Sequence, residues 1–451
     1  MTAYVNVLAD WYDTVVNAVW LAASMTGDQS RGDQSRGLTA MRVGGQCGTV
    51  AGGNRMSDLT AFRQETRAWL EANCPPVMRT RMPEEEQVAG GKRAEYVRPE
   101  QKIWLDRMAE KGWTAPAWPK QYGGGGLSGE EALILEEEMQ DLGCRAPLRG
   151  MGLSMLGPVL LEYGTEEQRQ EHIPRIVRGE IRWCQGYSEP AAGSDLASLS
   201  TRAVLHGEHF LVNGHKIWTS NAHLSDWIFC LVRTDPTVKK HDGISFLLID
   251  MADPGVRPRP IRLISGKSVF CETFFENVRV PTDHLVGQLN KGWTIAKRLL
   301  EHERKGIGGI GARAAAKFEV TPEGLAKQYA GEENGRIADP ELRLRIAAYS
   351  MDAHAFQLTR RRAAEEAEAG TPPGPMSAMF KYYATELNKT RYEMLIAAEG
   401  FNALGWEGEP FTEDEIRLTR EWLRSKANSI EGGTSEIQLN IIAKRVLALP
   451  D

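Results

Sequence analysis

The sequence predicts an α+β protein in three parts: an N-terminal all-α domain (56–180), a middle antiparallel β domain (181–288) and a C-terminal four-helix bundle (289–451). Apolar residues recur at helical spacing before residue 180 and again after residue 292. Between these regions the spacing changes to alternation, and Asn-Gly, Asp-Pro and Asp-Gly dipeptides separate the alternating runs. The order of these two patterns is the basis of the predicted fold class.

Residues 1–55 are expected to stand outside this fold. "GDQSRGDQSRG" is a direct five-residue repeat, and the Gly-rich "VGGQCGTVAGGNR" follows it. Neither segment offers a pattern of apolar residues that a core would bury. We therefore expect an extension that is either non-native, with the native start at Met56, or a genuine disordered segment.

The N-terminal domain is predicted from three segments with helical spacing: "SDLTAFRQETRAWLEANC" (57–74), "PEQKIWLDRMAEKG" (99–112) and "SGEEALILEEEMQDLG" (128–143). A long loop rich in Pro and Gly, "WTAPAWPKQYGGGGLS", separates the second from the third.

The middle domain is predicted from short β-type runs: "HFLVNGHKIWTS", "DWIFCLVRT", "GISFLLID", "VRPRPIRLI" and "CETFFENVRV". Within the first run, Asn213-Gly214 lies between apolar residues, which predicts a β-hairpin with its turn at this pair.

The C-terminal bundle is predicted from long helical patterns: "WTIAKRLLEHER", "DPELRLRIAAYSMDAHAFQLTRRRAAEEAEAG", "SAMFKYYATELNKTRYEMLIAAEG" and a last helix from about Ser435.

The composition excludes several classes of protein. The formal net charge is -6 and no basic run is present, which argues against general nucleic-acid binding. The six cysteines form no CxxC spacing and no Cys/His cluster, so reduced thiols in a cytoplasmic protein are expected, with no metal site. No apolar run reaches the ~18 residues that a membrane span needs.

Three motifs carry a resemblance to a known family. They are "CQGYSEPAAGSDLASLSTRA" (184–203), "NGHKIWTSNA" (213–222) and "EGGTSEIQLNIIAKRVL" (431–447). In this order, within a helix–β–helix frame, they resemble the acyl-CoA dehydrogenase family over about residues 56–450. The resemblance implies FAD-dependent conversion of an acyl-CoA to a trans-2-enoyl-CoA, electron-transfer flavoprotein as the acceptor, and a homo-oligomer or a hetero-oligomer with a related subunit.

The chemistry agrees with a flavin, because oxidation at Cα–Cβ removes a hydride that no side chain can accept. By resemblance, six residues lie along the flavin: Gln185, Tyr187, Ser188, Trp218, Thr219 and Ser220. Ser188 would donate to the pyrimidine edge and Trp218 would stack on the ring. Thr219 and Ser220 would reach toward N5. The family most often has Thr at positions 188 and 220, and serine keeps the hydroxyl.

The resemblance offers two places for the catalytic base. One directly precedes Gly-Thr-Ser in the last motif, where this chain has Gly432, with Glu431 one residue too early. The other is a Glu-Arg pair on the first bundle helix, where this chain has Glu303-Arg304. Glu303 is therefore the favoured base and Glu431 the alternative. The Gly432 N–H would donate to the thioester carbonyl.

Other positions follow from the same resemblance. Ser194, Arg304 and Gly433 would contact the acyl-CoA. Four residues would contact the dinucleotide half of FAD: Gly400, Thr434, Ser435 and Glu436. Two segments depart from the family. Asn334 stands where Phe is expected, which puts the neighbouring pyrophosphate arginine in doubt, and Ala-Ala-Glu-Gly at 397–400 replaces Gly-Gly-Asn-Gly.

Each assignment has an alternative. Trp218 in isolation is typical of a core tryptophan, Ser188-Glu189-Pro190 of a plain turn, and Glu303 of a helix-surface acid paired with Arg298 or Arg304. The alternatives for the whole chain are an acyl-CoA oxidase or flavin monooxygenase on the same scaffold, and a non-catalytic or half-site subunit of a hetero-oligomer.

Overall fold

The computed structural model describes residues 51–80, 82–307, 320–368 and 374–450, with side chains described except at 51–57, 84, 301–307, 364, 367 and 368. The chain divides into two units, Met1–Arg55 and Met56–Asp451. The predicted extension at 1–55 falls almost wholly outside the described residues.

The N-terminal part is helical, as predicted. Its elements are α2 (Ala51–Asn73), η1 (Pro76–Arg79), η2 (Glu84–Glu86), α3 (Pro99–Glu110), η3 (Lys120–Tyr122), α4 (Gly129–Asp141), η4 (Gly152–Leu156), α5 (Gly157–Tyr163) and α6 (Glu166–Val177). Capping boxes begin α4 and α6, where Ser128 and Thr165 accept hydrogen bonds from the backbone three residues later. Buried Leu70, Trp104, Met108 and Leu135 join α2, α3 and α4 in one cluster.

The middle part is an eight-stranded sheet in the order β6-β7-β3-β2-β4-β5-β8, with β1 also paired to β4. Its elements are β1 (Trp183–Gly186), η5 (Leu196–Ser198), β2 (Arg202–His206), β3 (His209–Ser220), η6 (Ala222–Leu224), β4 (Trp227–Arg233), β5 (Ile244–Asp250), β6 (Val256–Ile261), β7 (Phe270–Pro281), η7 (Thr282–His284) and β8 (Leu285–Val286). The pairings are antiparallel except β1–β4 and β2–β4, which are parallel.

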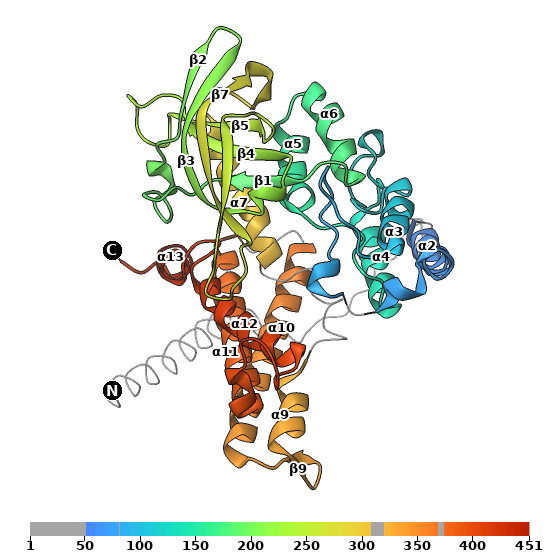
Figure 1. Ribbon diagram of the computed structural model, residues 1–451. Coiled ribbons are helices and arrows are strands. Elements are labelled where there is room, and N and C mark those ends of the chain that lie inside the picture. The colour runs from blue at the N-terminus through green and yellow to red at the C-terminus, as the bar shows by residue number, and fades with distance from the viewer. Residues whose placement is uncertain (1–50, 81, 308–319, 369–373, 451) are drawn as a thin grey trace, which may run out of the picture. The chain divides into compact units, whose positions relative to one another are not determined.

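Strand β4 takes part in both parallel pairings. Every residue of β4 is buried, as expected for a central strand covered on both faces. Phe229 and Leu231 pack with residues of α5, α6 and α7, whereas Cys230 and Val232 pack with residues of β3 and β7. Figure 1 shows the strands gathered above the C-terminal helices, with α5 and α6 beside them.

The predicted hairpin at Asn213-Gly214 is wrong. The chain runs straight through this pair within β3, and the turn between β2 and β3 lies at residues 207–208 instead. The register of β3 against β7 shifts between Val212 and Gly214, which marks a bulge. A Cβ on Gly214 would lie 2.5 Å from Thr201 Oγ1, so close strand packing is the reason for glycine here.

The C-terminal part is a helical bundle, which completes the predicted α+β fold. Its elements are α7 (Gly292–Ile307), α9 (Pro322–Ala330), β9 (Glu332–Glu333), β10 (Arg336–Ile337), α10 (Pro340–Glu368), η8 (Gly374–Met376), α11 (Ser377–Glu399), η9 (Gly400–Leu404), α12 (Glu413–Ser425), η10 (Lys426–Ser429), α13 (Ser435–Ile441) and η11 (Ile442–Val446). One buried cluster joins α9, α10, α11 and α12 through Leu325, Ile346, Leu395 and Leu418.

Candidate active site

Ser188 and Trp218, predicted on separate motifs, are brought together by backbone pairing. The N–H of Ile217 donates to the Ser188 carbonyl at 2.9 Å. Trp218 has a φ of 59° and its side chain is 53% exposed. A left-handed tryptophan is sterically unfavourable, and such backbone strain clusters at functional sites. The pairing thus presents an open indole face close to the Ser188 loop.

The structure separates the predicted flavin contacts into two groups. Gln185, Ser188 and Ser220 are partly exposed. Tyr187 and Thr219 are buried, and the Tyr187 ring packs edge-on against two phenylalanines of the core. The Thr219 hydroxyl has no hydrogen-bond partner among the described residues, and its expected approach to the flavin stays a prediction. The Tyr187 ring belongs to the core, and the predicted contact of this residue with the flavin stays a prediction.

Ser194 lies in an exposed loop between β1 and β2. Its neighbour Asp195 pairs with Lys240 at 2.8 Å, and both side chains are about half exposed. Exposed pairs of this kind contribute little to stability. The loop is therefore a surface feature on which Ser194 is accessible, as the substrate prediction requires.

Glu189 and Lys216 form a buried ion pair behind this surface. Lys216 Nζ lies 2.7 Å from Glu189 Oε1 and 3.1 Å from the Tyr187 carbonyl. Burial alone would raise the pKa of Glu189, but the charge of Lys216 and hydrogen bonds to the carboxylate outweigh it and lower the pKa to about 2. The carboxylate is thus ionised and fully paired. Sequence reasoning left Glu189 as a plain turn residue and missed Lys216.

The turn that precedes α13 contains two left-handed glycines. Gly432 has a φ of 64° and Gly433 a φ of 89°. Both carbonyls accept hydrogen bonds from Gln438 Nε2, at 3.2 Å and 3.3 Å. Among the described residues, none accepts a hydrogen bond from the Gly432 N–H. The turn therefore presents a backbone donor where the resemblance places one for the thioester.

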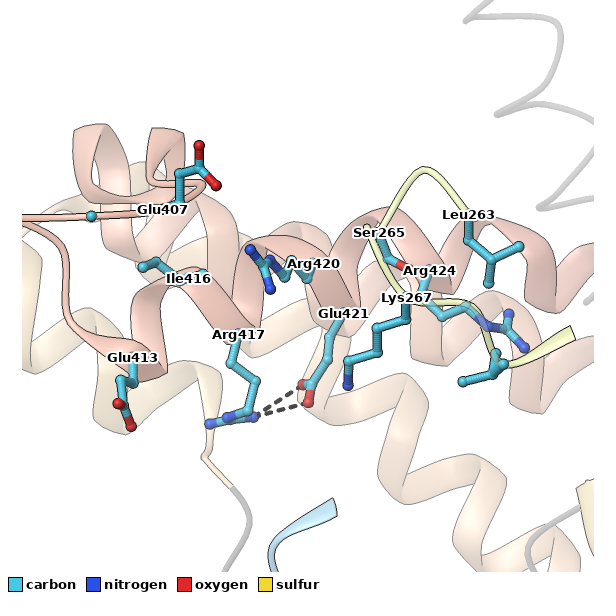
Figure 2. A pocket seen from close by; sticks show the side chains of 12 residues that line it. Leu263, Ser265, Lys267, Glu407, Glu413, Ile416, Arg417, Arg420, Glu421 and Arg424 are labelled. Atoms are coloured by element: carbon cyan, nitrogen blue, oxygen red, sulfur yellow. Dashed lines mark hydrogen bonds and ion pairs between the residues drawn. The ribbon is translucent and has the colours of Figure 1, made fainter. Parts of the chain in front are cut away.

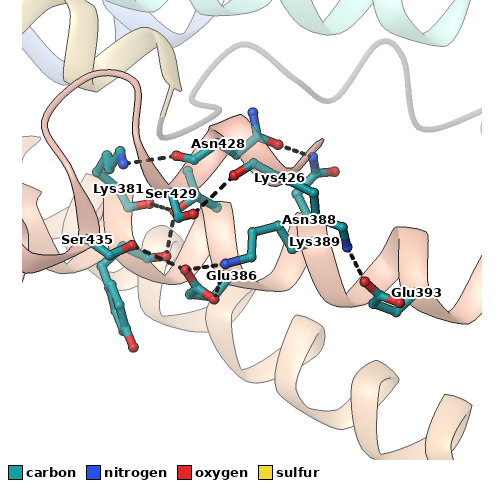
Figure 3. Close-up of polar contacts among 11 residues, drawn as sticks. Lys381, Glu386, Asn388, Lys389, Glu393, Lys426, Asn428, Ser429 and Ser435 are labelled. Atoms are coloured by element: carbon teal, nitrogen blue, oxygen red, sulfur yellow. Dashed lines mark hydrogen bonds and ion pairs between the residues drawn. The ribbon is translucent and has the colours of Figure 1, made fainter. Parts of the chain in front are cut away.

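The residues after this turn serve different purposes. The Thr434 hydroxyl caps α13 by accepting from the Ile437 N–H at 3.3 Å. Ser435 is buried and its hydroxyl donates to Glu386 at 3.2 Å (Figure 3). Glu436 is exposed in the first helical turn. Of the four predicted dinucleotide contacts, Glu436 alone has an exposed charged side chain, and its carboxylate also accepts from the Thr434 hydroxyl. The predicted contact of Ser435 with the dinucleotide stays a prediction.

A buried lysine anchors the segment leading into the turn. Lys381 on α11 is fully buried and donates to the Asn428 carbonyl at 3.0 Å. The Asn388 amide donates to the Asn428 side chain at 2.9 Å (Figure 3). Glu386 on the same helix pairs with Lys389 at 2.9 Å as well as accepting from Ser435. Helix α11 therefore holds the turn from both sides.

Glu431, the alternative base, is held by two donors. Its Oε2 accepts from Arg424 at 2.6 Å and its Oε1 from Asn428 at 2.5 Å. The Arg424 guanidinium also lies over the Phe270 ring at 5.4 Å, and Phe270 packs edge-on against Trp218 at 6.1 Å. This chain of contacts joins the turn to the indole, and sequence reasoning missed both Arg424 and Phe270.

The favoured base, Glu303, and its neighbour Arg304 lie in the last two turns of α7. Their side chains fall outside the described part of the structure. The preceding turns of the helix are anchored in the core, because Ile295, Ala296 and Leu299 are buried against β4 and β5.

The two segments that depart from the family lie at the far ends of helices α9 and α11. Asn334 and Gly335 form the turn of a two-stranded hairpin, β9–β10, whose first strand is Glu332-Glu333. Gly400 ends α11 with a φ of 59°. The preceding Glu399 is buried, and its Oε2 has no hydrogen-bond partner among the described residues.

A cavity of about 470 Å³ lies between the β6–β7 loop and α12 (Figure 2). Its walls carry Lys267, Arg417, Arg420 and Arg424 together with Glu407, Glu413 and Glu421. Arg417 pairs with Glu421 at 3.1 Å across one wall. The charges nearly balance, and Arg424 belongs both to this cavity and to the contacts of Glu431.

The described residues contain neither a candidate metal site nor a candidate membrane-spanning helix. No group of three or more His, Cys, Asp or Glu side chains in that part of the chain has the geometry to hold a metal ion. No helix within it is long and apolar enough to cross a membrane.

Family models match the chain in three consecutive regions: the acyl-CoA dehydrogenase N-terminal domain over residues 56–180, the middle domain over 184–278 and the C-terminal domain over 290–447. The chain belongs to the acyl-CoA dehydrogenase family. This acyl-CoA dehydrogenase is 34% identical over 397 residues to acyl-CoA dehydrogenase IpdE1 of Mycobacterium tuberculosis, covering 88% of this chain and 99% of that protein.

Solved structures of the family superpose on this acyl-CoA dehydrogenase. The Tcur3481-Tcur3483 steroid ACAD matches with a TM-score of 0.70 and 30% identity, covering 87% of this chain and 98% of that chain. The ChsE4-ChsE5 complex from Mycobacterium tuberculosis matches with a TM-score of 0.66 and 28% identity, covering 91% of this chain and 100% of that chain.

Members of the family are FAD-dependent flavoproteins, so this acyl-CoA dehydrogenase is an oxidoreductase that uses FAD to dehydrogenate acyl-CoA. The described residues fit a flavin. Trp218 offers a half-exposed aromatic face, and Ser188 and Ser220 offer partly exposed hydroxyls on the two segments that the Ile217–Ser188 hydrogen bond joins. A flat ring with polar edges needs this combination of a stacking surface and small donors.

Proposed function

We propose that Glu303 removes the α-proton of the acyl-CoA and that the Gly432 N–H binds the thioester carbonyl. FAD, when bound, supplies the acceptor for the β-hydride. Ser188, Trp218 and Ser220 would hold its ring, and Glu436 its dinucleotide half. The product is a trans-2-enoyl-CoA, and electron-transfer flavoprotein is the proposed electron acceptor.

The observation that carries this proposal is the conformation of Gly432. A left-handed φ of 64° disfavours any side chain at the position where many family members have their base. The same conformation leaves the Gly432 N–H without a partner among the described residues. A thioester α-proton is weakly acidic, and a backbone donor at the carbonyl oxygen stabilises the negative charge that develops there.

Two further observations favour Glu303 over Glu431. Both Glu431 oxygens accept hydrogen bonds, from Arg424 and Asn428, so this carboxylate is already engaged by two donors of the chain. Position 303 follows Leu299 by four residues and Ile295 by eight, a helical spacing from these two buried residues.

The test is flavin reduction by a panel of acyl-CoAs under anaerobic conditions. Purified protein should contain FAD, and its absorbance should bleach with at least one substrate. Glu303→Gln should slow bleaching by about 10²–10⁴-fold while retaining FAD. Glu301→Gln is the matched control, because a residue two positions away points to a different side of the helix. Normal bleaching by Glu303→Gln would refute the assignment.

The substrate class we propose is a bulky, ring-bearing acyl-CoA. The support is the match to the Tcur3481-Tcur3483 steroid ACAD over 87% of this chain. The panel should therefore include steroid side-chain thioesters beside linear and branched chains. Faster bleaching by a linear chain than by every ring-bearing thioester would contradict this class.

A second candidate is a chain that completes its FAD site only with a different subunit. Glu332 and Glu333 in β9 put carboxylates directly before Asn334, which stands at the family's Phe position, near the expected pyrophosphate arginine. Two carboxylates repel a pyrophosphate. Two of the matching structures also carry the names of two different proteins, the Tcur3481-Tcur3483 steroid ACAD and the ChsE4-ChsE5 complex. Colourless protein that becomes yellow and active only with a related subunit would support this candidate.

A further inference from the structure

The Glu189 carboxylate joins three segments that are separate in the sequence. Its Oε1 accepts from Lys216 at 2.7 Å and from the Thr201 N–H at 2.9 Å. Its Oε2 accepts from the N–H and the hydroxyl of Ser200, at 2.7 Å and 2.8 Å. Each oxygen therefore has two donors. One side chain ties together the loop after β1, the start of β2 and the middle of β3.

Each of these segments carries a predicted site residue. Ser188 directly precedes Glu189, and Ser194 lies in the loop that Ser200 ends. Lys216 lies two residues before Trp218, and a second shift in the register of β3 against β7 begins directly after Lys216 and includes Trp218. Lys216 also donates to the Tyr187 carbonyl at 3.1 Å, which fixes the backbone on the other side of Ser188.

The pair is fully enclosed, with Lys216 0% exposed and Glu189 5% exposed. Burying two charges costs free energy that a hydrophobic pair of the same volume does not, so stability alone is a weak explanation for this ion pair. What the pair supplies is geometry, because a carboxylate with four donors fixes the direction and distance of each segment that donates to it.

We propose that Glu189 and Lys216 are positioning residues that set the Ser188 hydroxyl and the Trp218 ring at the spacing the flavin requires. The inference rests on the proposed flavin site, and it extends that site to two residues that do not themselves reach the surface. Loss of the pair should leave the sheet folded but let the Ser188 loop and the β3 bulge move apart.

The test compares Glu189→Gln, Lys216→Met and the double variant Glu189→Gln/Lys216→Met with the wild-type chain. Glu189→Gln keeps the shape of the side chain and removes its charge. The double variant removes both charges, so no uncompensated charge remains buried and thermal stability should recover. The matched control is Glu276→Gln, the same change in an exposed pair with Arg257 on the same sheet.

FAD affinity is expected to fall at least about tenfold in all three variants, because small displacements of positioning groups have large effects on a site. The flavin absorption envelope should also shift. Hydrogen exchange in the FAD-free chain should accelerate over residues 187–201 and 213–220. Glu276→Gln should change none of these properties.

The double variant decides between positioning and plain stability. Recovered thermal stability with FAD affinity still reduced supports positioning. Recovered stability with FAD affinity within twofold of the wild type overturns it. A double variant that does not fold also overturns it, since the pair would then be required for the fold itself. If the wild-type chain binds no FAD, alone or with a related subunit, the flavin site fails and this inference fails with it. FAD bound equally by wild type and variants refutes the inference alone.

Discussion

Arg424 donates to Glu431 at 2.6 Å while its guanidinium lies 5.4 Å over the ring of Phe270. One side chain of α12 therefore contacts both the turn before α13 and the strand beside Trp218. The acid that lies closest in sequence to the family's base position is thus part of a structural link between the sheet and the bundle. This arrangement gives the first prediction.

Glu431→Gln should retain a rate of flavin bleaching within about threefold of the wild type, because Glu431 is not the proposed base. Loss of the true base would slow bleaching by about 10²–10⁴-fold. The free energy of unfolding should fall by about 1 kcal/mol, because a part-exposed ion pair contributes little. Stopped-flow absorbance and urea unfolding measure the two quantities. Bleaching reduced a hundredfold with intact folding would make Glu431 the base instead.

The two glycines of the same turn give the second prediction. Gly433→Ala should destabilise the protein by about 1–2 kcal/mol, because its φ is 89° and left-handed conformations cost that much for a residue with a Cβ. A Cβ there would also lie 2.5 Å from Gln438 Nε2. Gly335→Ala, at a left-handed position with nothing near its Cβ, is the control for conformation without a clash.

The order of the parts was predictable because each pattern is local. Helical spacing and alternation indicate which faces of a segment are buried, and the folded chain has helices and strands in the order that they predict. The hairpin at Asn213-Gly214 was not predictable, because the same dipeptide suits a turn or a bulge and only the long pairing of β3 with β7 decides between them. Helix α12 was not predicted, because its segment is rich in charged residues. The Thr-x-x-Glu spacing of its capping box, Thr412 and Glu415, is nevertheless visible in the sequence.

The sequence motifs indicated the candidate site residues, but they did not indicate the residues that pack behind them. Ser188 and Trp218 stand in recognisable stretches. Lys216 pairs with Glu189 across 27 residues of sequence, and Phe270 meets Arg424 only in the folded chain. Nothing in the spacing of such residues indicates contact. Alternation would place Lys216 and Trp218 on one face, yet Lys216 is buried and Trp218 exposed, because the register of β3 against β7 shifts between Lys216 and Thr219.

Lys381 gives the third prediction. Lys381→Met should lower the free energy of unfolding by about 1–3 kcal/mol, because it leaves the Asn428 carbonyl without its buried donor. The turn before α13 should also loosen, raising hydrogen exchange at residues 428–434. Lys389→Met is the control: this lysine pairs with Glu386 while partly exposed, so its loss should cost less than about 1 kcal/mol. Equal losses for the two variants would contradict the prediction.

Trp218 gives the fourth. Trp218→Gly should reduce FAD affinity by about tenfold, since an aromatic contact contributes about 0.5–1.5 kcal/mol beyond the area it buries. The stability of the FAD-free chain should change little, because glycine relieves the left-handed strain while a half-exposed ring is lost. Trp218→Phe should retain most of the affinity. Isothermal titration with FAD and thermal unfolding separate the two effects, and a large loss of stability in Trp218→Gly would make this tryptophan a core residue.

The fifth prediction concerns pH and Glu399. Burial, reinforced by the nearby Glu415 carboxylate, raises the pKa of Glu399 to about 7 from an ordinary value of 4.5. Between these two values the folded chain holds a proton that the unfolded chain has released. The free energy of unfolding should therefore fall as pH rises from about 4.5 through 7 and level off above it. The difference between the two pKa values corresponds to an upper limit of about 3 kcal/mol.

Glu399→Gln should remove this dependence, because the amide is neutral at every pH. Relative to the wild type, the variant should be more stable at pH 8 and nearly unchanged at pH 5. Glu189, which is paired with Lys216, should show the opposite pH dependence. Its lowered pKa contributes stability that is present above about pH 4.5 and is lost only as the pH falls toward 2. Urea unfolding at pH 5, 6, 7 and 8 measures the slope. An identical slope in wild type and Glu399→Gln would show that Glu399 is ionised in the folded chain, and that Glu415 and the helix ends around Gly400 tolerate a second buried charge.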